Sequence, residues 1–300
     1  MAMTHTVTLP DGRILAFEEY GDPAGFPVLS CHGGLSSRLD AAPAHAAAVT
    51  KGVRLISPDR PGIGRSTYQP GRRLLDWTAD VERLTELLGI GRFAVMGWSA
   101  GGPYAAVCAA KLGGRVTAAA LLSSSVPLDL YGTRRGLSVD DRVLLALSKH
   151  TPWLASAVIK ASIVNASNTR LLRAVLRSFP PADRSIIAEW GPPEQSLAFV
   201  REAVAQGTEG SVQDYRIFGA PWGFALEEIR VPVHIWEGSE DHTGPPGYRE
   251  FLHRHIEGST VTVVPGEGHL SLLPRQAPAI FDALLGGDHN AESTTRWNVG

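Results

Sequence analysis

Cysteine is almost absent from this sequence, and so are long hydrophobic runs. The chain of 300 residues contains two cysteines, Cys31 and Cys108, and we expect both to be buried thiols that form no disulfide. No apolar run approaches the ~18 residues that span a bilayer. The N-terminal segment lacks the basic and apolar regions of a secretory signal. These absences together predict a cytoplasmic protein.

Charge of either sign is also modest. Charged residues make up 19% of the chain, and the formal net charge is −2. This balance gives no reason to expect a nucleic-acid or membrane partner. Hydrophobic residues make up 44% of the chain, which is typical of a globular protein with a large core. Composition leaves open whether the chain forms a homo-oligomer.

Short apolar segments alternate with helical segments through much of the chain. The predicted strands are residues 6–9, 13–20, 27–31, 53–57, 92–96, 116–122, 231–236 and 260–264. The predicted helices between and after them are residues 37–49, 76–88, 102–111, 248–256 and 274–285. This alternation is typical of an α/β fold with a mostly parallel, doubly wound sheet that is covered by helices on both faces.

The alternation stops between residues 126 and 223, where we find helical signals and no convincing strand. The predicted helices of this segment are 139–149, 154–162, 169–176, 182–189 and 196–206. We therefore predict a core formed by residues 1–125 and 224–286, with residues 126–223 inserted as a helical cap, or lid. Residues 287–300 are polar and without periodicity, which predicts a loose tail.

One stretch carries the clearest chemical signal, Gly97-Trp98-Ser99-Ala100-Gly101. It follows a predicted strand and precedes a predicted helix, which is the context of a nucleophile elbow. In this sharp turn, a side chain two residues before or after the serine collides with a neighbouring element, and glycine avoids the collision. The pattern predicts Ser99 as a nucleophile exposed at the edge of the sheet.

A serine hydroxyl needs a general base, and the base needs a carboxylate that orients it. With this kind of elbow the expected chain order is Ser, then Asp or Glu, then His. Asp241 follows the predicted strand 231–236 and His269 follows the strand 260–264. Both therefore belong at the carboxyl edge of the sheet, where ligands bind in such folds. Glu237 and Glu240 remain alternatives to Asp241.

The tetrahedral intermediate of such a reaction needs hydrogen-bond donors for its oxyanion. The backbone N–H of Ala100, which follows the nucleophile, is one expected donor. Gly34, in the glycine-rich loop after the strand 27–31, is the expected second donor. We expect His32 to brace this loop without transferring a proton. The chain has no H-E-x-x-H or C-x-x-C pattern, and we predict no metal site.

With these residues in place, the chain resembles the α/β-hydrolase superfamily across residues 6–285. The matching motifs are residues 32–34, 59–66 and 97–101, with Asp241 and His269. The resemblance implies cleavage of an ester, thioester, amide or lactone through an acyl-enzyme, with no cofactor. Ser99 departs from the aspartate nucleophile of the epoxide hydrolases and dehalogenases. The elbow also departs from the Gly-Gly-Ser-Trp-Gly of the proline aminopeptidases.

We expect a small-molecule substrate, specifically a small to medium apolar ester. The helical insertion is rich in apolar residues and has aromatic residues along or beside it, namely Trp153, Phe179, Trp190, Phe199 and Trp222. Trp98 and Trp222 are expected to line the pocket, and Arg60 and Arg65 are the nearest basic residues by loop position. Two alternatives stay open: a carbon–carbon bond hydrolase with the same triad, and a ligand sensor with negligible turnover.

Overall fold

The computed structural model describes residues 4–130, 132–166, 177, 179–192, 197–245 and 247–286, apart from the side chains of 164–166. At its centre is an eight-stranded sheet in the order β1-β2-β4-β3-β5-β6-β7-β8. Its strands are β1 (His5–Thr8), β2 (Ile14–Gly21), β3 (Phe26–Cys31), β4 (Val53–Pro58), β5 (Phe93–Trp98), β6 (Val116–Leu122), β7 (Val233–Gly238) and β8 (Thr260–Val264). The pairs β1–β2 and β2–β4 are antiparallel. The remaining pairs are parallel, which confirms the mostly parallel α/β fold.

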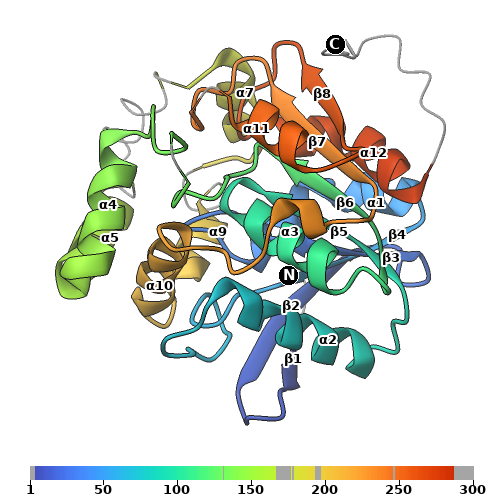
Figure 1. Ribbon diagram of the computed structural model, residues 1–300, viewed down its shortest axis with the longest axis horizontal. Helices are drawn as coiled ribbons and strands as arrows, with labels where there is room; N and C mark the ends of the chain where they lie inside the picture. The colour runs from blue at the N-terminus through green and yellow to red at the C-terminus, as the bar shows by residue number, and fades with distance from the viewer. Residues whose placement is uncertain are drawn as a thin grey trace.

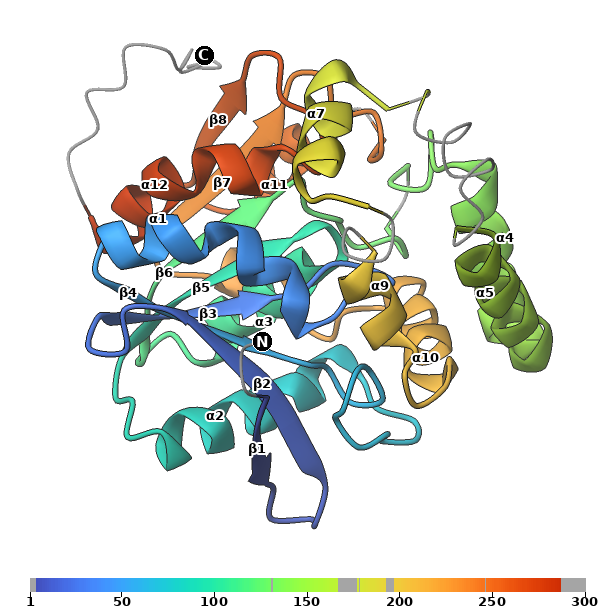
Figure 2. The ribbon, with the colours of Figure 1, turned by 180° about the vertical axis from the view of Figure 1, so that it is seen from behind.

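Helices cover both faces of this sheet. Figure 1 shows α2 (Trp77–Leu87), α3 (Gly102–Lys111) and α11 (Tyr248–His255) on one face. Figure 2 shows α1 (His45–Thr50) and α12 (Leu272–Leu285) on the other. Short 3₁₀ turns are η1 (Arg38–Ala44), η2 (Leu74–Asp76), η3 (Ser99–Gly101) and η4 (Leu226–Glu228). Among the described residues, no helix has the length and hydropathy to cross a bilayer.

The helix predicted over residues 37–49 is divided into η1 and α1. Pro43 lies inside η1, and its missing N–H cannot join the hydrogen-bond ladder of an α-helix. The tighter 3₁₀ turn accommodates this proline, and regular α-helix begins at His45. The prediction of a helical segment was therefore right, while the helix type was not.

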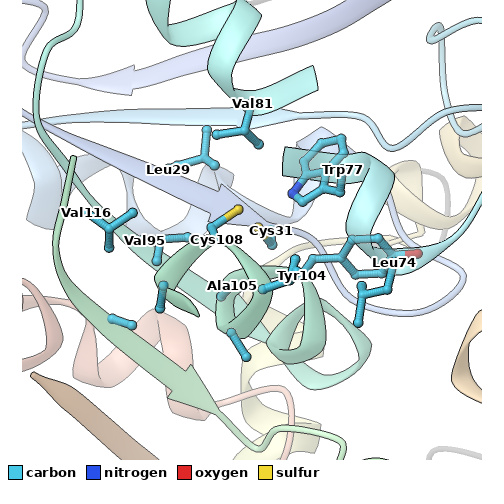
Figure 3. Close-up of a cluster of buried hydrophobic side chains, with 14 of the residues drawn as sticks. Leu29, Cys31, Leu74, Trp77, Val81, Val95, Tyr104, Ala105, Cys108 and Val116 are labelled. Atoms are coloured by element: carbon cyan, nitrogen blue, oxygen red, sulfur yellow. The ribbon is translucent and has the colours of Figure 1, made fainter. Parts of the chain in front are cut away.

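The larger of the two main layers of the core lies between the sheet and helices α2 and α3 (Figure 3). Leu29 and Val95 of the strands and Val81 of α2 are all buried in this layer. Cys31 and Cys108 belong to the same cluster and are both buried free thiols, as the sequence predicts. Burial raises the pKa of the Cys31 thiol to about 12, so this group stays protonated and packs as a small apolar side chain.

The chain between β6 and β7 forms helices, and its described residues contain no strand. These helices are α4 (Val139–His150), α5 (Pro152–Ala166), α7 (Pro181–Glu189), α9 (Ala198–Ala203) and α10 (Glu209–Phe218). The predicted helix 169–176 and the predicted tail 287–300 lie outside the described residues. The sequence analysis missed α10. Its buried face includes the polar residues Ser211, Gln213 and Asp214. Apolar residues therefore do not occupy every buried position, and the periodic pattern that predicts a helix is weak here.

The helical insertion is tied to the core through α10. Helices α4 and α5 project to one side of the molecule (Figures 1 and 2). Leu144 of α4 and Ile159 of α5 form a small apolar cluster with Val212 of α10. At its other end, α10 contributes Ile217 and Phe218 to the core beside the sheet. The insertion therefore shares one buried helix with the core and has a small cluster of its own.

Candidate active site

The stretch around Ser99 has the strained geometry of a nucleophile elbow. Strand β5 ends at Trp98, and η3 and then α3 begin directly after it. Ser99 has a φ of +56°, a left-handed conformation that is costly for a residue with a side chain. A Cβ atom on Gly97 would overlap the carbonyl of Gly101, and one on Gly101 would overlap the carbonyl of Cys31. The positions two residues before and two residues after the serine therefore require glycine.

His269 and Asp241 lie together at the carboxyl ends of two neighbouring strands. Asp241 follows β7, His269 follows β8, and these strands are paired in parallel. The distance from His269 Nδ1 to Asp241 Oδ2 is 2.8 Å. Burial raises the pKa of Asp241, but the hydrogen bond and positive charge of His269 outweigh burial and lower it to about 2. Asp241 is therefore ionised at neutral pH.

The two alternative carboxylates have other partners. Glu237 lies in β7 and pairs with Arg249 at 2.9 Å. Burial raises the pKa of Glu237 to about 7, against the lowering effect of Arg249. The Glu240 side chain is half exposed and lies 3.9 Å from His242. Of the three acids considered from the sequence, the structure brings Asp241 to the His269 imidazole.

Trp98 packs directly on His269. The indole Nε1–H donates to the His269 carbonyl oxygen at 3.1 Å. The two rings lie with their centroids 5.1 Å apart. A Cβ atom on Gly33 would come within 3 Å of the Trp98 ring, so the glycine-rich loop also lies close to this indole. Trp98 thus links the loop after β3 to the loop after β8.

A cavity of about 490 Å³ lies at this edge of the sheet. It is lined by five of the residues predicted for the site, Gly34, Trp98, Ser99, Ala100 and His269. The helical insertion supplies an apolar wall that includes Phe179, Phe199, Tyr215 and Phe218. The cavity therefore brings the elbow serine and the histidine to one space, enclosed between the sheet edge and the insertion.

The pocket role predicted for Trp222 is wrong. Its side chain is 4% exposed, belongs to the core beside the sheet, and does not line this cavity. The chain has already returned to the core at the end of α10, so Trp222 stacks on Phe224 with ring centroids 5.9 Å apart. Trp153 is 72% exposed on α5, so it also lies outside the pocket.

His32 braces the glycine-rich loop, as the sequence predicts. Its side chain is fully buried, and its Nε2 accepts a hydrogen bond from the Arg60 backbone N–H at 3.1 Å. The Arg60 guanidinium donates to the carbonyls of both His32 and Gly33. Burial, and then the charge of Arg60, lower the pKa of His32. This neutral imidazole and the arginine hold the backbone that leads into Gly34.

Arg60 is in turn paired with a residue of the insertion that the sequence analysis missed. Asp214 of α10 accepts from Arg60 Nη2 at 2.9 Å and from Arg72, and both pairs are buried. The Tyr104 hydroxyl donates to the same carboxylate at 2.9 Å. Burial raises the pKa of Asp214, but the two guanidinium charges outweigh it and hold the pKa well below its ordinary value. The loop before Gly34 is thus supported from the insertion.

A second missed residue, Asp183 of α7, supports the loop that carries His269. Its carboxylate accepts hydrogen bonds from the backbone N–H groups of His269 at 3.0 Å, Leu270 at 3.0 Å and Ser271 at 2.9 Å. Asp183 is 1% exposed. In the sequence it is one of many acids on predicted helices, and no local pattern distinguishes it. Its partners become apparent only in the folded chain.

The chemistry available here is that of a hydroxyl, an imidazole and a carboxylate. Within the part of the chain that the structure describes, no cluster of three or more His, Cys, Asp or Glu side chains is arranged to hold a metal ion. The strained serine, the paired histidine and the apolar cavity together suit nucleophilic attack on a small molecule.

Comparison with known proteins identifies the class to which this chain belongs. Residues 27–276 match the family described as alpha/beta hydrolase fold, so the chain belongs to that family. Among curated proteins it is similar to the uncharacterized hydrolase YcgS of Bacillus subtilis. The two are 26% identical over 287 residues, which cover 94% of this chain and 96% of that protein. The family match supports a hydrolase function.

Solved structures share the whole architecture at low identity. An esterase from Exiguobacterium antarcticum aligns with a TM-score of 0.70 and 20% identity, covering 95% of this chain and 98% of that one. An enol-lactonase from Burkholderia xenovorans aligns with a TM-score of 0.68 and 19% identity, covering 94% and 98%. At this identity the similarity shows a shared fold.

Proposed function

We propose that this protein is a serine hydrolase that cleaves a small to medium apolar ester, or a related acyl compound, through an acyl-enzyme. One observation carries the proposal. Ser99, in a strained elbow, lines the same cavity as His269, whose Nδ1 lies 2.8 Å from Asp241 Oδ2. A nucleophile, a base and an orienting carboxylate in this order form the constellation that activates a serine hydroxyl.

In the proposed mechanism, His269 Nδ1 carries a proton and donates it in a hydrogen bond to Asp241, which leaves Nε2 free to act as the base. Nε2 takes the proton of the Ser99 hydroxyl as Oγ bonds to the substrate carbonyl carbon. The bond from that carbon to the leaving oxygen then breaks, and the leaving oxygen receives the proton from His269. Water attacks the resulting acyl-enzyme with His269 again as the base, which restores Ser99 and releases the acid.

The backbone N–H groups of Gly34 and Ala100 are the proposed donors to the oxyanion. Both residues line the cavity, and a Cβ atom on Gly34 would lie 3.3 Å from the Ala100 Cβ, so the two residues adjoin. Backbone donors fixed by the elbow and by the braced loop need no rearrangement when the negative charge develops. Such preorganised donors commonly supply several kcal/mol of transition-state stabilisation.

We propose that residues 126–223 act as a cap over a core formed by residues 1–125 and 224–286. The apolar side chains that the insertion contributes to the cavity, including Phe179 and Phe218, support an apolar substrate. Each methylene buried in the transition state contributes about 0.8 kcal/mol. The kcat/KM for acyl esters should therefore rise from acetyl toward butyryl or hexanoyl and level off once the cavity is full.

A panel of p-nitrophenyl esters of graded acyl length tests the proposal, together with lactones, amides and a diketone. We expect sustained turnover of the short esters, with a rate that depends on Ser99. A single stoichiometric burst would indicate the ligand sensor. Faster cleavage of the diketone than of any ester would indicate a carbon–carbon bond hydrolase on the same triad.

A further inference from the structure

The cavity that Ser99 lines contains one acidic residue, Asp141. Among the described residues around this cavity, Asp141 is the one aspartate or glutamate, and none is a lysine or an arginine. The rest of this lining is apolar or uncharged, apart from the imidazole of His269. Asp141 has no part in the proposed reaction, yet it shares the cavity with the nucleophile and the base.

Asp141 lies in the first turn of helix α4, where it takes part in the cap of that helix. Its backbone N–H donates to Ser138 Oγ at 3.0 Å, and the Ser138 hydroxyl donates to Asp141 Oδ2 at 2.8 Å. An asparagine would also present an acceptor oxygen at this position. The cap therefore explains the acceptor oxygen of Asp141 and does not require its negative charge.

The negative charge of Asp141 acts on two tyrosines that line the same cavity from other helices, Tyr215 of α10 and Tyr248 of α11. Burial raises the pKa of the Tyr215 hydroxyl, and the charge of Asp141 raises it further. The same two causes, in the same order, raise the pKa of the Tyr248 hydroxyl. A tyrosinate would be an anion that Asp141 repels. An anionic group on a ligand in this cavity would meet the same repulsion.

The charge of Asp141 differs in its surroundings from that of Asp214, the acid of α10. Asp214 is paired with Arg60 and Arg72, and these guanidinium groups offset its charge. The Ser138 hydroxyl that contacts Asp141 is uncharged, and among the described residues of the cavity lining no lysine or arginine offsets the carboxylate. Asp141 is half-buried, so solvent screens its charge in part. A ligand that displaces this solvent interacts with the charge more strongly.

The position of Asp141 in the insertion suits a role in substrate selection. Ser99 and His269 come from loops of the core, whereas Asp141 comes from α4 and lines the cavity together with the apolar wall that includes Phe179 and Phe218. A charge on this wall acts on the part of the substrate that does not react. Near a protein surface, two unit charges about 10 Å apart change an equilibrium constant roughly tenfold. One carboxylate is therefore sufficient to select among substrates by charge.

We propose that Asp141 sets the charge selectivity of the active-site cavity, so that the enzyme favours esters with a cationic group, accepts neutral esters and discriminates against esters with an anionic group. The inference deepens the function proposed above and rests on it. Asp141 is then a specificity-determining residue, which transfers no proton and forms no bond to the substrate. The substrate class narrows to apolar esters that are neutral or carry a positive charge.

Three p-nitrophenyl esters test this inference, because they differ in charge and resemble one another in shape. Each acyl chain has three methylene groups after the ester carbonyl and ends in a trimethylammonium, a tert-butyl or a sulfonate group. Release of p-nitrophenol is followed at neutral pH and low ionic strength, with the uncatalysed rate subtracted. We expect kcat/KM to fall in that order, with an ammonium-to-sulfonate ratio of roughly tenfold or more.

Asp141→Asn should bring the ammonium-to-sulfonate ratio close to one, because it removes the charge and keeps the acceptor oxygen of the helix cap. Asp140→Asn is the matched control, since it changes the net charge by the same amount in the same turn of α4. Asp140 is exposed and does not line the cavity, and its charge acts on Tyr215 less than that of Asp141 does. The ratio for Asp140→Asn should therefore stay close to the wild-type value.

A second pair of variants keeps the test open if Asp141→Asn fails to fold. Ser162 of α5 is exposed and lines the cavity, so Ser162→Lys should place a cation at its rim. The ammonium-to-sulfonate ratio should then fall several-fold, because this cation offsets the charge of Asp141. Ala161 precedes Ser162, is also exposed and does not line the cavity, so Ala161→Lys should change the ratio much less.

The outcomes separate the inference from the proposed function. If no ester is cleaved with a dependence on Ser99, the proposed function fails and the inference fails with it. If Ser99 cleaves the esters but the wild-type ratio is close to one, the inference alone is overturned. It is also overturned if Asp141→Asn lowers the melting temperature and kcat/KM for all three esters alike, since Asp141 then serves the helix cap only. An equal fall of the ratio in Asp140→Asn would assign the selectivity to the net charge of the molecule and would likewise overturn it.

Discussion

The carboxylate of Asp183 lies 3.0 Å from the backbone nitrogen of His269 and accepts its hydrogen bond. The same side chain accepts from the next two N–H groups of the loop. Asp183 belongs to helix α7 of the insertion, while His269 follows the last strand of the core. The insertion therefore fixes the backbone position of the proposed base.

We expect Asp183→Asn to lower kcat about tenfold while changing KM less. An amide presents one acceptor oxygen and one donor group, so at least one of the three N–H groups faces a donor. The displaced loop then misaligns His269 in the transition state more than it disturbs substrate binding. The measurement is steady-state kinetics on p-nitrophenyl butyrate, with the melting temperature recorded in parallel.

Glu189→Gln, at the exposed end of the same helix, is the control and should retain wild-type kinetics. Asp183→Glu should recover part of kcat, because a carboxylate accepts all three hydrogen bonds if its longer side chain can be accommodated. A fall in melting temperature with no change in kcat would show that Asp183 stabilises the fold without positioning His269.

Ser99→Ala should lower ester turnover by roughly a thousandfold or more, because no acyl-enzyme can form. The fold should persist, since the substitution removes one hydroxyl at the edge of a cavity. Ser125→Ala is the control, because Ser125 lines the same cavity and has no role in the proposed reaction. Wild-type turnover in Ser99→Ala, measured with a p-nitrophenyl ester, would falsify the assignment of the nucleophile.

His269→Ala should cost more activity than Asp241→Asn. The first substitution removes the base, whereas the second leaves a base that is poorly oriented. Activity of the wild-type enzyme should fall on acidification, because a protonated imidazole cannot accept the Ser99 proton. Glu240→Gln provides the comparison and should be active. An active Asp241→Asn beside an inactive Glu240→Gln would reverse our choice of acid.

The ionised Asp241 carboxylate should also make the free energy of unfolding depend on pH under acidic conditions. The pKa of its carboxyl is lowered in the folded chain from 3.8 to about 2, equivalent to roughly 2 kcal/mol of stabilisation. Because the pKa of Asp241 is lower in the folded chain than in the unfolded chain, ionisation of this carboxyl favours the folded state. The stabilisation is complete above pH ~4 and is lost as the pH falls toward the folded-state value. The free energies of unfolding of wild type and Asp241→Asn, measured by urea titration, should therefore converge between pH 4 and 2. A constant difference across that range would contradict the prediction.

Sequence patterns predict those residues of the candidate site that come directly after a strand in the chain. The motif at Ser99 specifies its own turn, and Asp241 and His269 each follow an apolar strand. Parallel pairing then places strand ends at one edge of the sheet, and the structure places these two side chains in contact. The positions of Asp241 and His269 after their strands were therefore sufficient to predict this contact, while the catalytic roles of these residues stay predictions.

The residues that support the site from the insertion could not be predicted in this way. Asp214 lies on a helix whose buried face is partly polar, and its partners, Arg60 and Arg72, are more than a hundred residues away in the sequence. The prediction for Trp222 failed in the other direction, because it assigned to the pocket a residue that belongs to the core. An aromatic residue near the insertion suggests a pocket wall, but its position depends on where the chain re-enters the core, and tertiary packing decides that.

The buried ion pairs of Asp214 lead to the last prediction. Asp214→Asn leaves the guanidinium groups of Arg60 and Arg72 buried beside a neutral amide, and removing one partner from a buried charge cluster typically costs about 3–5 kcal/mol. Because Arg60 also holds the carbonyls of His32 and Gly33, ester turnover should fall together with the free energy of unfolding.

Urea titration with parallel kinetics on p-nitrophenyl butyrate checks both effects. Glu209→Gln, at the exposed start of the same helix, is the control. It should change the free energy of unfolding by no more than about 0.5 kcal/mol, the usual range for surface substitutions, and should leave ester turnover at the wild-type rate. The double variant Asp214→Leu/Arg72→Met removes both members of one of the two ion pairs of Asp214, and it should lose less stability than the sum of its single variants. Additive losses in the double variant would mean that Asp214 and Arg72 do not stabilise each other.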